Sequence, residues 1–469
     1  MVTRRIVEAA EAMEGQVIAG AALADVASRT FTGGAIDSRQ VRGGELFFAL
    51  AGSRADGHRF VPAALAAGAA AAVVSQPELA PGPSEVLIRV ADPYQALHAL
   101  TRAIRRQLPQ HLVGLTGSAG KTTTKELLAA MLGRRFRVAR SPGNLNNLLG
   151  FPLALLSIPE GTEWMVAEMG MSTPGELAGI SRLARPDVAM LLNVRPVHLE
   201  RFGTLAAIAE AKAEILAGLA PDGLLLANAD DPEVRRVALR HPGRIVWFGH
   251  GEGAEVRAAG VEPLPEGRPG HRFRLLAGGQ SQEVELPLLG LHNVDNALAA
   301  AACAWALGVP LEQIALAAAE AQPAPGRGEI YHLEGGITLI DDSYNSNPEA
   351  VSRALEGAAA LPAARRWLVL GEMLELGPEA PGFHRRSGRE AAERGFSPVF
   401  TVGGLGSEIA AGAVEAGARS QAFADVEAVI PAALAELAPG DLLLVKGSRG
   451  VALDRVVDAL RAARRGEGG

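Results

Sequence analysis

The residues whose types and spacing could do chemistry are concentrated in one short run, GSAGKTT, at residues 117–123. The run follows the strand-like HLVGLT and opens a helix-like stretch beginning TTTKELL. Glycines let consecutive backbone N–H groups face phosphate oxygens, a helix start adds partial positive charge, and Lys121 can reach the outer phosphates. A threonine hydroxyl can hold Mg²⁺. The pattern therefore predicts a phosphate-binding loop made of Gly117, Ser118, Ala119, Gly120, Lys121, Thr122 and Thr123.

The loop departs from the full G-x-x-x-x-G-K-[ST] pattern. The first glycine position is occupied by Leu115, and Gly114 lies one residue early. The interpretation therefore depends on the shorter loop that begins at Gly117. Phosphate binding alone is compatible with a kinase, a GTPase, a ligase or a non-catalytic nucleotide sensor. A GTPase is disfavoured because the guanine-specific N-K-x-D motif is missing from the sequence, NADD at residues 228–231 being the nearest string.

Further candidate side chains also have ordinary structural explanations. Glu168 ends a strand-like run, where a carboxylate is as often structural as functional. Asn293 and Asn296 lie three residues apart at a helix start, so their amides could share one face and bind adenine, or they could cap the helix. Taken alone, His198 is an ordinary hydrogen-bonded side chain and Lys212 a surface lysine paired with a neighbouring acid. Only a wider context can favour a functional role for these residues.

These side chains must be positioned by a regular framework, and the sequence predicts an α/β one. Strand-like runs alternate with helix-like runs, which is typical of a parallel sheet with crossover helices. The stretch 244–290 is instead expected to form short antiparallel strands. The strands are predicted at residues 46–50, 71–75, 86–90, 111–115, 164–168, 188–193, 224–228, 338–341, 367–370, 399–402 and 442–445, and helices at 93–108 and 293–307.

The chain length of 469 residues is too great for one hydrophobic core, so several domains are expected. Turn-rich segments place boundaries near Asp92 and in AQPAPGRG, where clustered Pro and Gly cannot continue a helix. We predict three domains, at residues 1–92, 93–321 and 322–469. The central one would carry the phosphate loop on a parallel sheet, and the last would be a Rossmann-like doubly wound sheet.

Composition excludes several classes of function. The net charge is −7 and no long basic run occurs, which argues against nucleic-acid binding and favours small-molecule partners. No apolar run reaches the roughly 20 residues of a membrane span, and the N-terminus lacks the apolar core of a signal peptide. The single cysteine, Cys303, rules out an intrachain disulfide and is expected to be a buried apolar residue. We expect a cytoplasmic monomer.

Beyond the loop, a series of strings occurs in the order seen in the Mur ligases, and the chain resembles that family over nearly its whole length. The strings that resemble the central ATP-binding domain are GNLNNLLGFPL from 143, VAEMGMSTPGEL from 166, NVRPVHLERFGT from 193 and IAEAKAEIL from 208. Those similar to the D-alanyl-D-alanine-adding branch of the family are LGLHNVDNALAAAA from 289, PGRGEI from 325, IDDSYNSNPEA from 340 and VLGEMLELG from 369.

The resemblance implies an ATP-dependent ligase that joins UDP-N-acetylmuramoyl-tripeptide to D-alanyl-D-alanine through an acyl phosphate. Such a step belongs to peptidoglycan precursor synthesis, and so to cell-wall formation and cell division. It implies a catalytic set of Lys121, Glu168, His198 and Lys212, with Mg²⁺ held by Thr122, Glu168, His198 and a carbamylated Lys212. It further implies ATP contacts from Asn293, Asn296, Arg327 and Asp342, the last two reaching the nucleotide from the third domain.

Substrate-binding residues are also expected from the resemblance. The segment AIDSRQVRGGELFFALAGSRADGHRF resembles the part that binds the uridine diphosphate end, although a DSR turn is commonplace by itself. The candidate residues are Asp37, Ser38 and Arg39 in that segment, and Asn144, Asn146 and Asn147 in GNLNN for the sugar-peptide. Lysine and meso-diaminopimelate both remain open as the third residue of the tripeptide.

Two alternative functions remain open at this point. Another Mur ligase or a folylpolyglutamate-type synthetase would share the central domain, but IDDSYNSNP and LGEMLELG argue against both, and the D-N-P-R motif of the meso-diaminopimelate-adding enzymes does not occur. A P-loop kinase or nucleotide-binding switch would explain the loop, yet it would leave Lys212, HNVDN and the third domain without a role.

Overall fold

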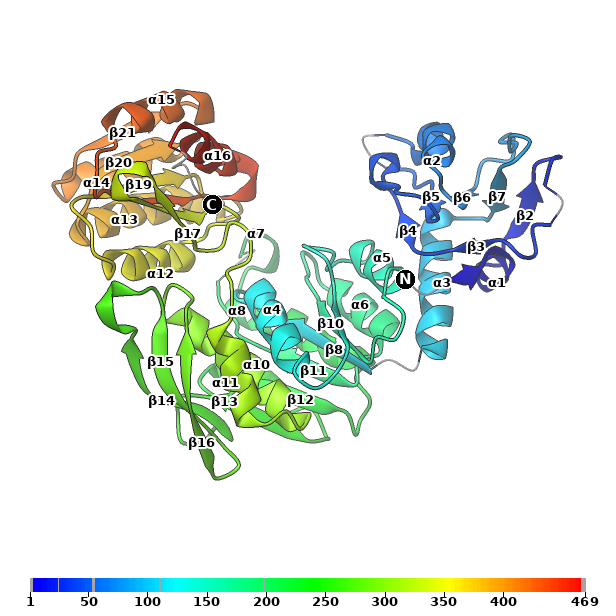
Figure 1. Ribbon diagram of the computed structural model, residues 1–469, viewed down its shortest axis with the longest axis horizontal. Coiled ribbons are helices and arrows are strands. Elements are labelled where there is room, and N and C mark those ends of the chain that lie inside the picture. The colour runs from blue at the N-terminus through cyan, green and yellow to red at the C-terminus, as the bar shows by residue number, and fades with distance from the viewer. Residues whose placement is uncertain (1–2, 24, 53–54, 109–110, 197–198, 465–469) are drawn as a thin grey trace.

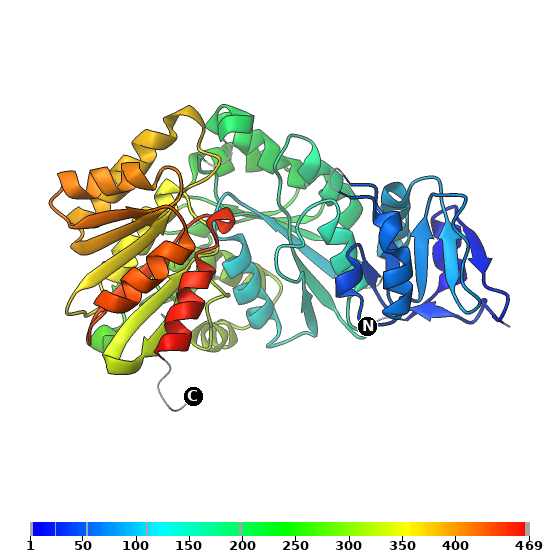
Figure 2. The same ribbon diagram turned by 90° about the horizontal axis from the view of Figure 1, so that it is seen from above.

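The computed structural model describes residues 3–23, 25–52, 55–108, 111–196 and 199–464. Within these ranges the chain has a three-domain α/β fold in which three large sheets follow one another along the sequence. The N-terminal and C-terminal units lie on opposite sides of the central one (Figure 1), and the view from above shows the same order (Figure 2). The predicted fold class is therefore confirmed.

The N-terminal unit is built on a sheet of strand order β2-β7-β6-β5-β4. Strand β2 is antiparallel to β7, and the other neighbours are parallel. A separate small sheet pairs β1 with β3. The elements are β1 (Arg4–Arg5), α1 (Ile6–Ala12), β2 (Gln16–Ala19), β3 (Thr30–Phe31), β4 (Gly34–Ala35), β5 (Leu46–Phe48), α2 (Val61–Ala66), β6 (Ala71–Val74), β7 (Val86–Arg89) and α3 (Pro93–Gln107).

Helix α3 connects this unit to the next one. It begins where Asp92 accepts a hydrogen bond from the backbone N–H of Tyr94, with Pro93 in the first turn, a position that tolerates proline. Its apolar side packs into the core of the N-terminal sheet, together with two leucines of α5 from the central unit. The domain boundary near Asp92 stays a prediction, and α3 contributes its buried face to the N-terminal core.

The central unit carries the sheet order β16-β15-β14-β13-β12-β11-β8-β10-β9. Helices α4, α10 and α11 cover one face, and α5, α6, α8 and α9 cover the other, so the middle strands are buried on both sides. The strands are β8 (His111–Thr116), β9 (Val138–Arg140), β10 (Trp164–Glu168), β11 (Val188–Leu191), β12 (Leu224–Asn228), β13 (Ile245–Gly249), β14 (Val256–Pro263), β15 (His271–Ala277) and β16 (Gln280–Leu286). The helices are α4 (Lys121–Leu132), α5 (Gly150–Leu156), α6 (Glu176–Ala184), α7 (Leu199–Phe202), α8 (Leu205–Ala213), α9 (Pro232–Ala238), α10 (His292–Ala306) and α11 (Leu311–Ala319).

The stretch 244–290 differs in part from the expectation of antiparallel strands. Strand β15 is antiparallel to both β14 and β16, as predicted, but β13 runs parallel to both β12 and β14. The reason is the crossover through α9, which returns the chain to the start of the sheet before β13 begins. The expectation was therefore wrong for β13.

The C-terminal unit has the strand order β17-β18-β22-β19-β20-β21, with β17 antiparallel to an otherwise parallel sheet. Helices α12, α13 and α14 pack on one face and α15 and α16 on the other, as expected for a doubly wound sheet. Its elements are β17 (Glu329–Leu333), β18 (Ile337–Asp342), α12 (Pro348–Ala359), β19 (Arg366–Gly371), α13 (Ala380–Glu393), β20 (Phe396–Val402), α14 (Gly406–Glu415), β21 (Ser420–Phe423), α15 (Val426–Glu436), β22 (Leu442–Lys446) and α16 (Asp454–Ala463).

The carboxyl ends of the parallel strands gather the candidate residues. In the central sheet, β8 ends before the phosphate loop, β10 ends at Glu168 and β11 ends two residues before Asn193. In the C-terminal sheet, β18 ends at Asp342 and β22 at Lys446. These ends face one cavity, in keeping with the rule that ligands bind at the carboxyl edge of open α/β sheets. Across the part of the chain that the structure describes, no helix is both apolar enough and long enough to cross a membrane.

Candidate active site

A cavity of about 340 Å³ lies between the central and C-terminal units. Every residue of the predicted phosphate loop except Gly117 lines this cavity. Asn144, Asn146 and Glu168 line it from neighbouring loops and strands, and Asn293 and Asn296 line it from α10. Arg327 and Asp342 reach it from the C-terminal unit, so both units contribute to one site.

The phosphate loop is shaped by its own backbone and by α10. Lys121, the first residue of α4, donates a hydrogen bond from Nζ to the Gly117 carbonyl at 2.9 Å, which closes the loop on itself. Gly120 has a φ of +79° and lies directly under the Asn296 amide. A Cβ at this glycine would stand 2.1 Å from Asn296 Oδ1. Position 120 therefore requires glycine for two reasons: the backbone has a positive φ, and there is no room for a side chain.

Asn193 and Arg195 hold the other side of the loop, and sequence reasoning did not single them out. The Asn193 side chain accepts from the Ala119 N–H at 2.9 Å and donates to the Ala119 carbonyl at 3.1 Å. The backbone N–H of Arg195 donates to Ser118 Oγ at 2.9 Å. The NVRP string after β11 lay within the resemblance, but only the three-dimensional structure places it against the loop.

Glu168 is a buried carboxylate with a different partner on each oxygen. Thr122 Oγ1 donates to Glu168 Oε2 at 2.8 Å, and Asn146 Nδ2 donates to Glu168 Oε1 at 2.8 Å. The backbone N–H of Glu168 donates to Ser141 Oγ at 3.2 Å. Because a buried carboxylate is stable only when its oxygens are hydrogen-bonded, these contacts fix the group next to the phosphate loop.

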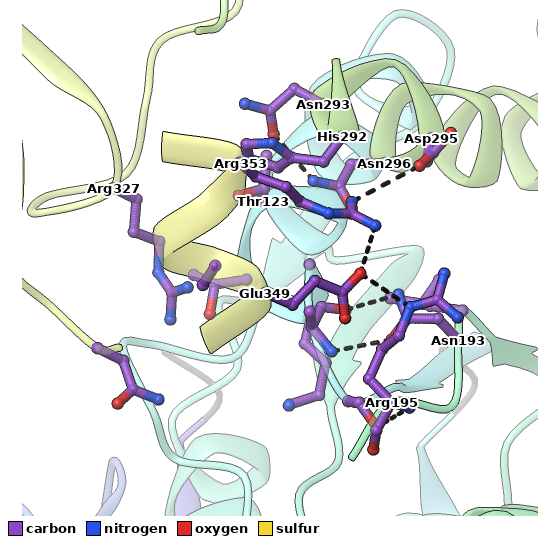
Figure 3. Close-up of a pocket in the computed structure, with 18 of the residues that line it drawn as sticks. Thr123, Asn193, Arg195, His292, Asn293, Asp295, Asn296, Arg327, Glu349 and Arg353 are labelled. Atoms are coloured by element: carbon purple, nitrogen blue, oxygen red, sulfur yellow. Dashed lines mark hydrogen bonds and ion pairs between the residues drawn. The ribbon is translucent and has the colours of Figure 1, made fainter. Parts of the chain in front are cut away.

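Asn293 and Asn296 are bonded to each other within α10. Asn296 Nδ2 donates to Asn293 Oδ1 at 2.9 Å, while Asn293 Nδ2 donates back to the Leu289 carbonyl at 2.8 Å. Thr124 Oγ1 adds a long contact of 3.4 Å to Asn296 Oδ1. Both amides line the cavity, and Figure 3 shows them together on the α10 side of it. His292 lies beside them, and burial lowers its pKa to about 4, which keeps the imidazole neutral at pH 7.

The C-terminal unit contributes a paired set of charges to the cavity. Lys446, which is buried at the end of β22, donates to Asp342 Oδ2 at 2.7 Å and to the Asn345 carbonyl at 3.0 Å. The guanidinium of Arg327 lies 4.2 Å from the Tyr344 ring centre. Lys446 was not among the predicted site residues. A signal for it was present in the sequence, since it is the one charged residue at the end of the apolar run LLLVK.

A chain of ion pairs joins the two units along one wall of the cavity. Glu349, in the first turn of α12, contacts Arg195 Nε of the central unit at 3.1 Å and Arg353 Nη2 at 2.6 Å. Arg353 lies 3.9 Å from Asp295 of α10, and Arg195 also reaches buried Asp231 at 3.1 Å. Figure 3 shows Glu349 pointing from α12 toward Arg195. These half-exposed pairs are worth about 0.2–1 kcal/mol each, so they orient the two units more than they stabilise the chain.

Lys121 of the phosphate loop and Lys212 of α8 lie in different electrostatic surroundings. Desolvation lowers the pKa of the Lys121 ammonium and Arg327 lowers it further, while Glu168 offsets part of the effect. Lys212 lies on α8 with 3% of its surface exposed. Burial lowers its pKa well below the usual value and the charge of Lys121 lowers it further. Within the described residues, no hydrogen bond or ion pair engages the Lys212 amine.

The remaining predicted residues lie elsewhere. Asp37 caps the short turn that follows, accepting from the Arg39 N–H at 3.0 Å and pairing with its guanidinium at 2.7 Å, and this turn does not line the cavity. Asn147 Oδ1 accepts from the N–H groups of Leu149 and Gly150, so it caps the start of α5. His198 lies outside the described residues. Ser38 belongs to the same turn as Asp37.

Comparison with known proteins agrees with this geometry. Models of the Mur ligase middle domain, the Mur ligase glutamate ligase domain and the Mur ligase family catalytic domain match residues 115–304, 326–449 and 30–105, respectively. The UDP-N-acetylmuramoyl-tripeptide--D-alanyl-D-alanine ligase of Bacillus subtilis is 35% identical over 431 residues, which cover 91% of this chain and 93% of that protein. The chain belongs to the Mur ligase family.

Solved structures extend the likeness to the whole fold. A MurF crystal structure from Acinetobacter baumannii matches with a TM-score of 0.87 and 31% identity, covering 98% of this chain and 99% of that one. A MurF ligase from Thermotoga maritima, crystallised in complex with ADP, matches with a TM-score of 0.78 and 29% identity, covering 92% and 97%. All three domains of this Mur ligase are therefore present in these neighbours.

The contact between Gly120 and Asn296 gives a prediction for this Mur ligase. Gly120→Ala places a methyl group against the Asn296 amide, and we expect it to lower the free energy of unfolding by about 1–3 kcal/mol beyond the backbone effect. Gly143→Ala is the matched control, since Gly143 also has a positive φ, of +48°, but nothing lies within 4 Å of its added Cβ. Thermal or urea unfolding of the two variants measures the difference. Equal losses of stability would contradict the close contact.

Proposed function

We propose that this Mur ligase uses ATP to form the peptide bond between UDP-N-acetylmuramoyl-tripeptide and D-alanyl-D-alanine, a step of peptidoglycan precursor synthesis. The Bacillus subtilis relative carries the name of this reaction at 35% identity over 91% of the chain. This relationship favours the proposal over another Mur ligase or a folylpolyglutamate-type synthetase. A reaction that consumes ATP, together with the single cysteine, favours the cytoplasm.

The observation that carries the proposal is the shared cavity. A phosphate loop from the central unit faces Arg327, Asp342 and Lys446 from the C-terminal unit across one space. The neighbour crystallised with ADP supports the assignment of that space to a nucleotide. A ligase must also bring an incoming amine to the carboxylate that has been activated next to the phosphates, and a cavity shared by two units gives this second substrate a place beside the loop.

The chemistry follows from the charges that must meet. An oxygen of the substrate carboxylate attacks the γ-phosphorus of ATP, and the bond to the bridging oxygen breaks, so that an acyl phosphate forms and ADP leaves. The amine nitrogen of the dipeptide then attacks the acyl carbon, loses a proton, and the tetrahedral intermediate expels inorganic phosphate. Because several anions converge in the first step, Lys121 and Arg327 would offset the repulsion and hold the phosphates in line.

The residues fit a bound magnesium ion. Mg²⁺ prefers oxygen ligands, and the Thr122 hydroxyl and Glu168 carboxylate lie together beside the phosphate loop. We assign these two residues, with His198 and a carbamylated Lys212, as the groups that would hold the metal. When bound, Mg²⁺ would neutralise the phosphate oxygens as a Lewis acid. Glu168 is already desolvated and fixed by Asn146, which keeps the carboxylate in place before any ligand arrives.

The other predicted residues take their roles from the same arrangement. Asn296 would face the adenine ring, and Asn293 would hold the Asn296 amide in the required orientation through their 2.9 Å hydrogen bond. Asn144 and Asn146 would contact the sugar-peptide from the cavity wall. The Asp37–Arg39 turn would bind the uridine diphosphate end in the N-terminal unit, with Ser38 between them.

The direct test of the function is the substrate dependence of ADP formation. We expect purified enzyme to release ADP, with phosphate and the joined peptide, only when ATP, UDP-N-acetylmuramoyl-tripeptide and D-alanyl-D-alanine are all present. The reason is that the amine consumes the activated carboxylate and allows turnover. Equal turnover without the dipeptide would mean a kinase or an ATPase. Tripeptides ending in lysine and in meso-diaminopimelate, assayed side by side, establish which one is accepted.

Lys121 is expected to act directly on the transferred phosphate. Lys121→Ala should cost at least roughly 3 kcal/mol of transition-state stabilisation, which is a hundredfold or more in rate. Arg272→Ala is a suitable control, because Arg272 is a surface cation paired with Glu262 on the antiparallel strands far along the sheet. Steady-state ADP release measures both. If Lys121→Ala released ADP at a rate within a few-fold of wild type, the loop would have no direct part in the reaction.

Lys212 is expected to react with carbon dioxide. Its burial favours the neutral amine, which can attack CO₂ to give a carbamate and a proton, and the carbamate supplies two anionic oxygens suited to magnesium. We expect Lys212→Ala to be nearly inactive and to regain turnover partly with formate or acetate. Lys121→Ala is the control that these carboxylates should not rescue. A fully active Lys212→Ala enzyme, or well-ordered density for an unmodified Lys212 amine in a magnesium-loaded active complex, would rule the carbamate out.

A further inference from the structure

The distribution of lysine in this chain is unusual. Only four of its 45 Lys and Arg residues are lysine, namely Lys121, Lys125, Lys212 and Lys446. Lys125, Lys212 and Lys446 are buried, and Lys121 lies in the cavity wall. Where a chain otherwise uses arginine, a retained lysine marks a position at which a compact ammonium group is not interchangeable with a planar guanidinium. The proposed function gives roles to Lys121 and Lys212, and Lys446 holds Asp342 in the cavity. Lys125 has no role yet.

Lys125 lies one helical turn after Lys121 on α4, and its side chain is fully buried. Its Nζ donates to the Ser141 carbonyl at 2.8 Å and to the Gly143 carbonyl at 3.2 Å, and lies 3.4 Å from Glu126 Oε1. These two carbonyls belong to the segment that leaves β9 and leads into GNLNN. The ammonium therefore ties the phosphate-loop helix to the start of the asparagine loop.

The same segment supports the catalytic carboxylate. Ser141 Oγ accepts from the backbone N–H of Glu168 at 3.2 Å, and the Ser141 N–H donates to the Val166 carbonyl of β10 at 2.9 Å. Further along, Asn146 Nδ2 binds Glu168 Oε1. Helix α4, the loop and the end of β10 thus form a closed ring of contacts, in which Lys125 provides the link between α4 and the loop.

We infer that Lys125 is a positioning residue, which fixes residues 141–146 against α4 so that Asn144 and Asn146 face the phosphate loop across the cavity. The part of this inference that concerns substrate depends on the proposed function. A lysine that only filled space would lower the stability of the fold, because burying an ammonium group costs several kcal/mol unless all its protons are hydrogen-bonded. Here two carbonyls and a carboxylate receive it, and both carbonyls belong to the loop.

The test compares replacements that separate positioning from packing. Lys125→Met keeps a long unbranched side chain but removes every donor, whereas Lys125→Arg keeps charged donors in a bulkier shape. Leu128→Ala, a buried truncation on the same helix within the core shared with α10 and α11, is the control for general destabilisation. For each variant, KM for UDP-N-acetylmuramoyl-tripeptide and for ATP is measured, together with amide hydrogen exchange of residues 141–147 in the protein without substrates.

We expect Lys125→Met to raise KM for the tripeptide about tenfold or more through misplacement of the loop, with ATP KM changed far less and with faster exchange in residues 141–147. Lys125→Arg should be less impaired on both measures, and Leu128→Ala should leave tripeptide KM and loop exchange near wild type. A Lys125→Met protein that does not fold, beside a folded Lys125→Arg, also supports the donor role.

The inference would be overturned if Lys125→Arg were more impaired than Lys125→Met. If Lys125 only packs, methionine is the better replacement and arginine the worse, since the guanidinium overfills a buried site. Wild-type KM and wild-type loop protection in Lys125→Met would likewise contradict it. Failure of the proposed function is recognised separately, because the wild-type enzyme would then form no joined peptide, while the exchange measurements would still decide whether Lys125 holds the loop.

Discussion

The site depends on one buried carboxylate that is held from two directions. Glu168 ends strand β10 of the central unit, and its oxygens accept hydrogen bonds from Thr122 at the start of α4 and from Asn146 in the loop after β9. Taking an ionised carboxylate out of water costs several kcal/mol unless both oxygens are bonded, so neither partner can move away cheaply. The phosphate loop and the asparagine loop, which are far apart in sequence, are thereby held in a fixed relation to each other.

The sequence predicted the parts of this arrangement that depend on neighbouring residues, namely the phosphate loop and several strands. The phosphate loop was recognised because its glycines and its lysine lie within seven residues, and β10 and β12 were predicted with their observed bounds because each is a short apolar run. The direction of β13 was not predictable in the same way, since a strand pattern is identical for parallel and antiparallel pairing. Contacts such as Asn193 with Ala119, or Glu349 with Arg195, join segments brought together only by tertiary packing, so no spacing in the sequence indicates them.

Three of the cations that line the cavity between the two units are already paired with carboxylates. Lys446 is paired with Asp342, and Arg195 and Arg353 with Glu349. An anion that reaches these three cations would exchange one anionic partner for another. Such an exchange needs little reorganisation, which is the condition under which fixed charges are most effective in catalysis. The Arg195–Glu349 pair and the 3.9 Å contact between Arg353 and Asp295 join the C-terminal unit to the central one along this wall.

Lys121 and Lys212 are the same residue type in two different electrostatic surroundings. Both amines are desolvated, and the charge of Lys121 also lowers the pKa of Lys212. Glu168 stabilises the charge on Lys121, while burial and the charge of Lys121 both act against a proton on Lys212. The surroundings thus drive the two pKa values apart, as they do in acid–base pairs of many active sites. The positive charge is therefore less disfavoured on Lys121, beside the carboxylate, than on Lys212 of α8.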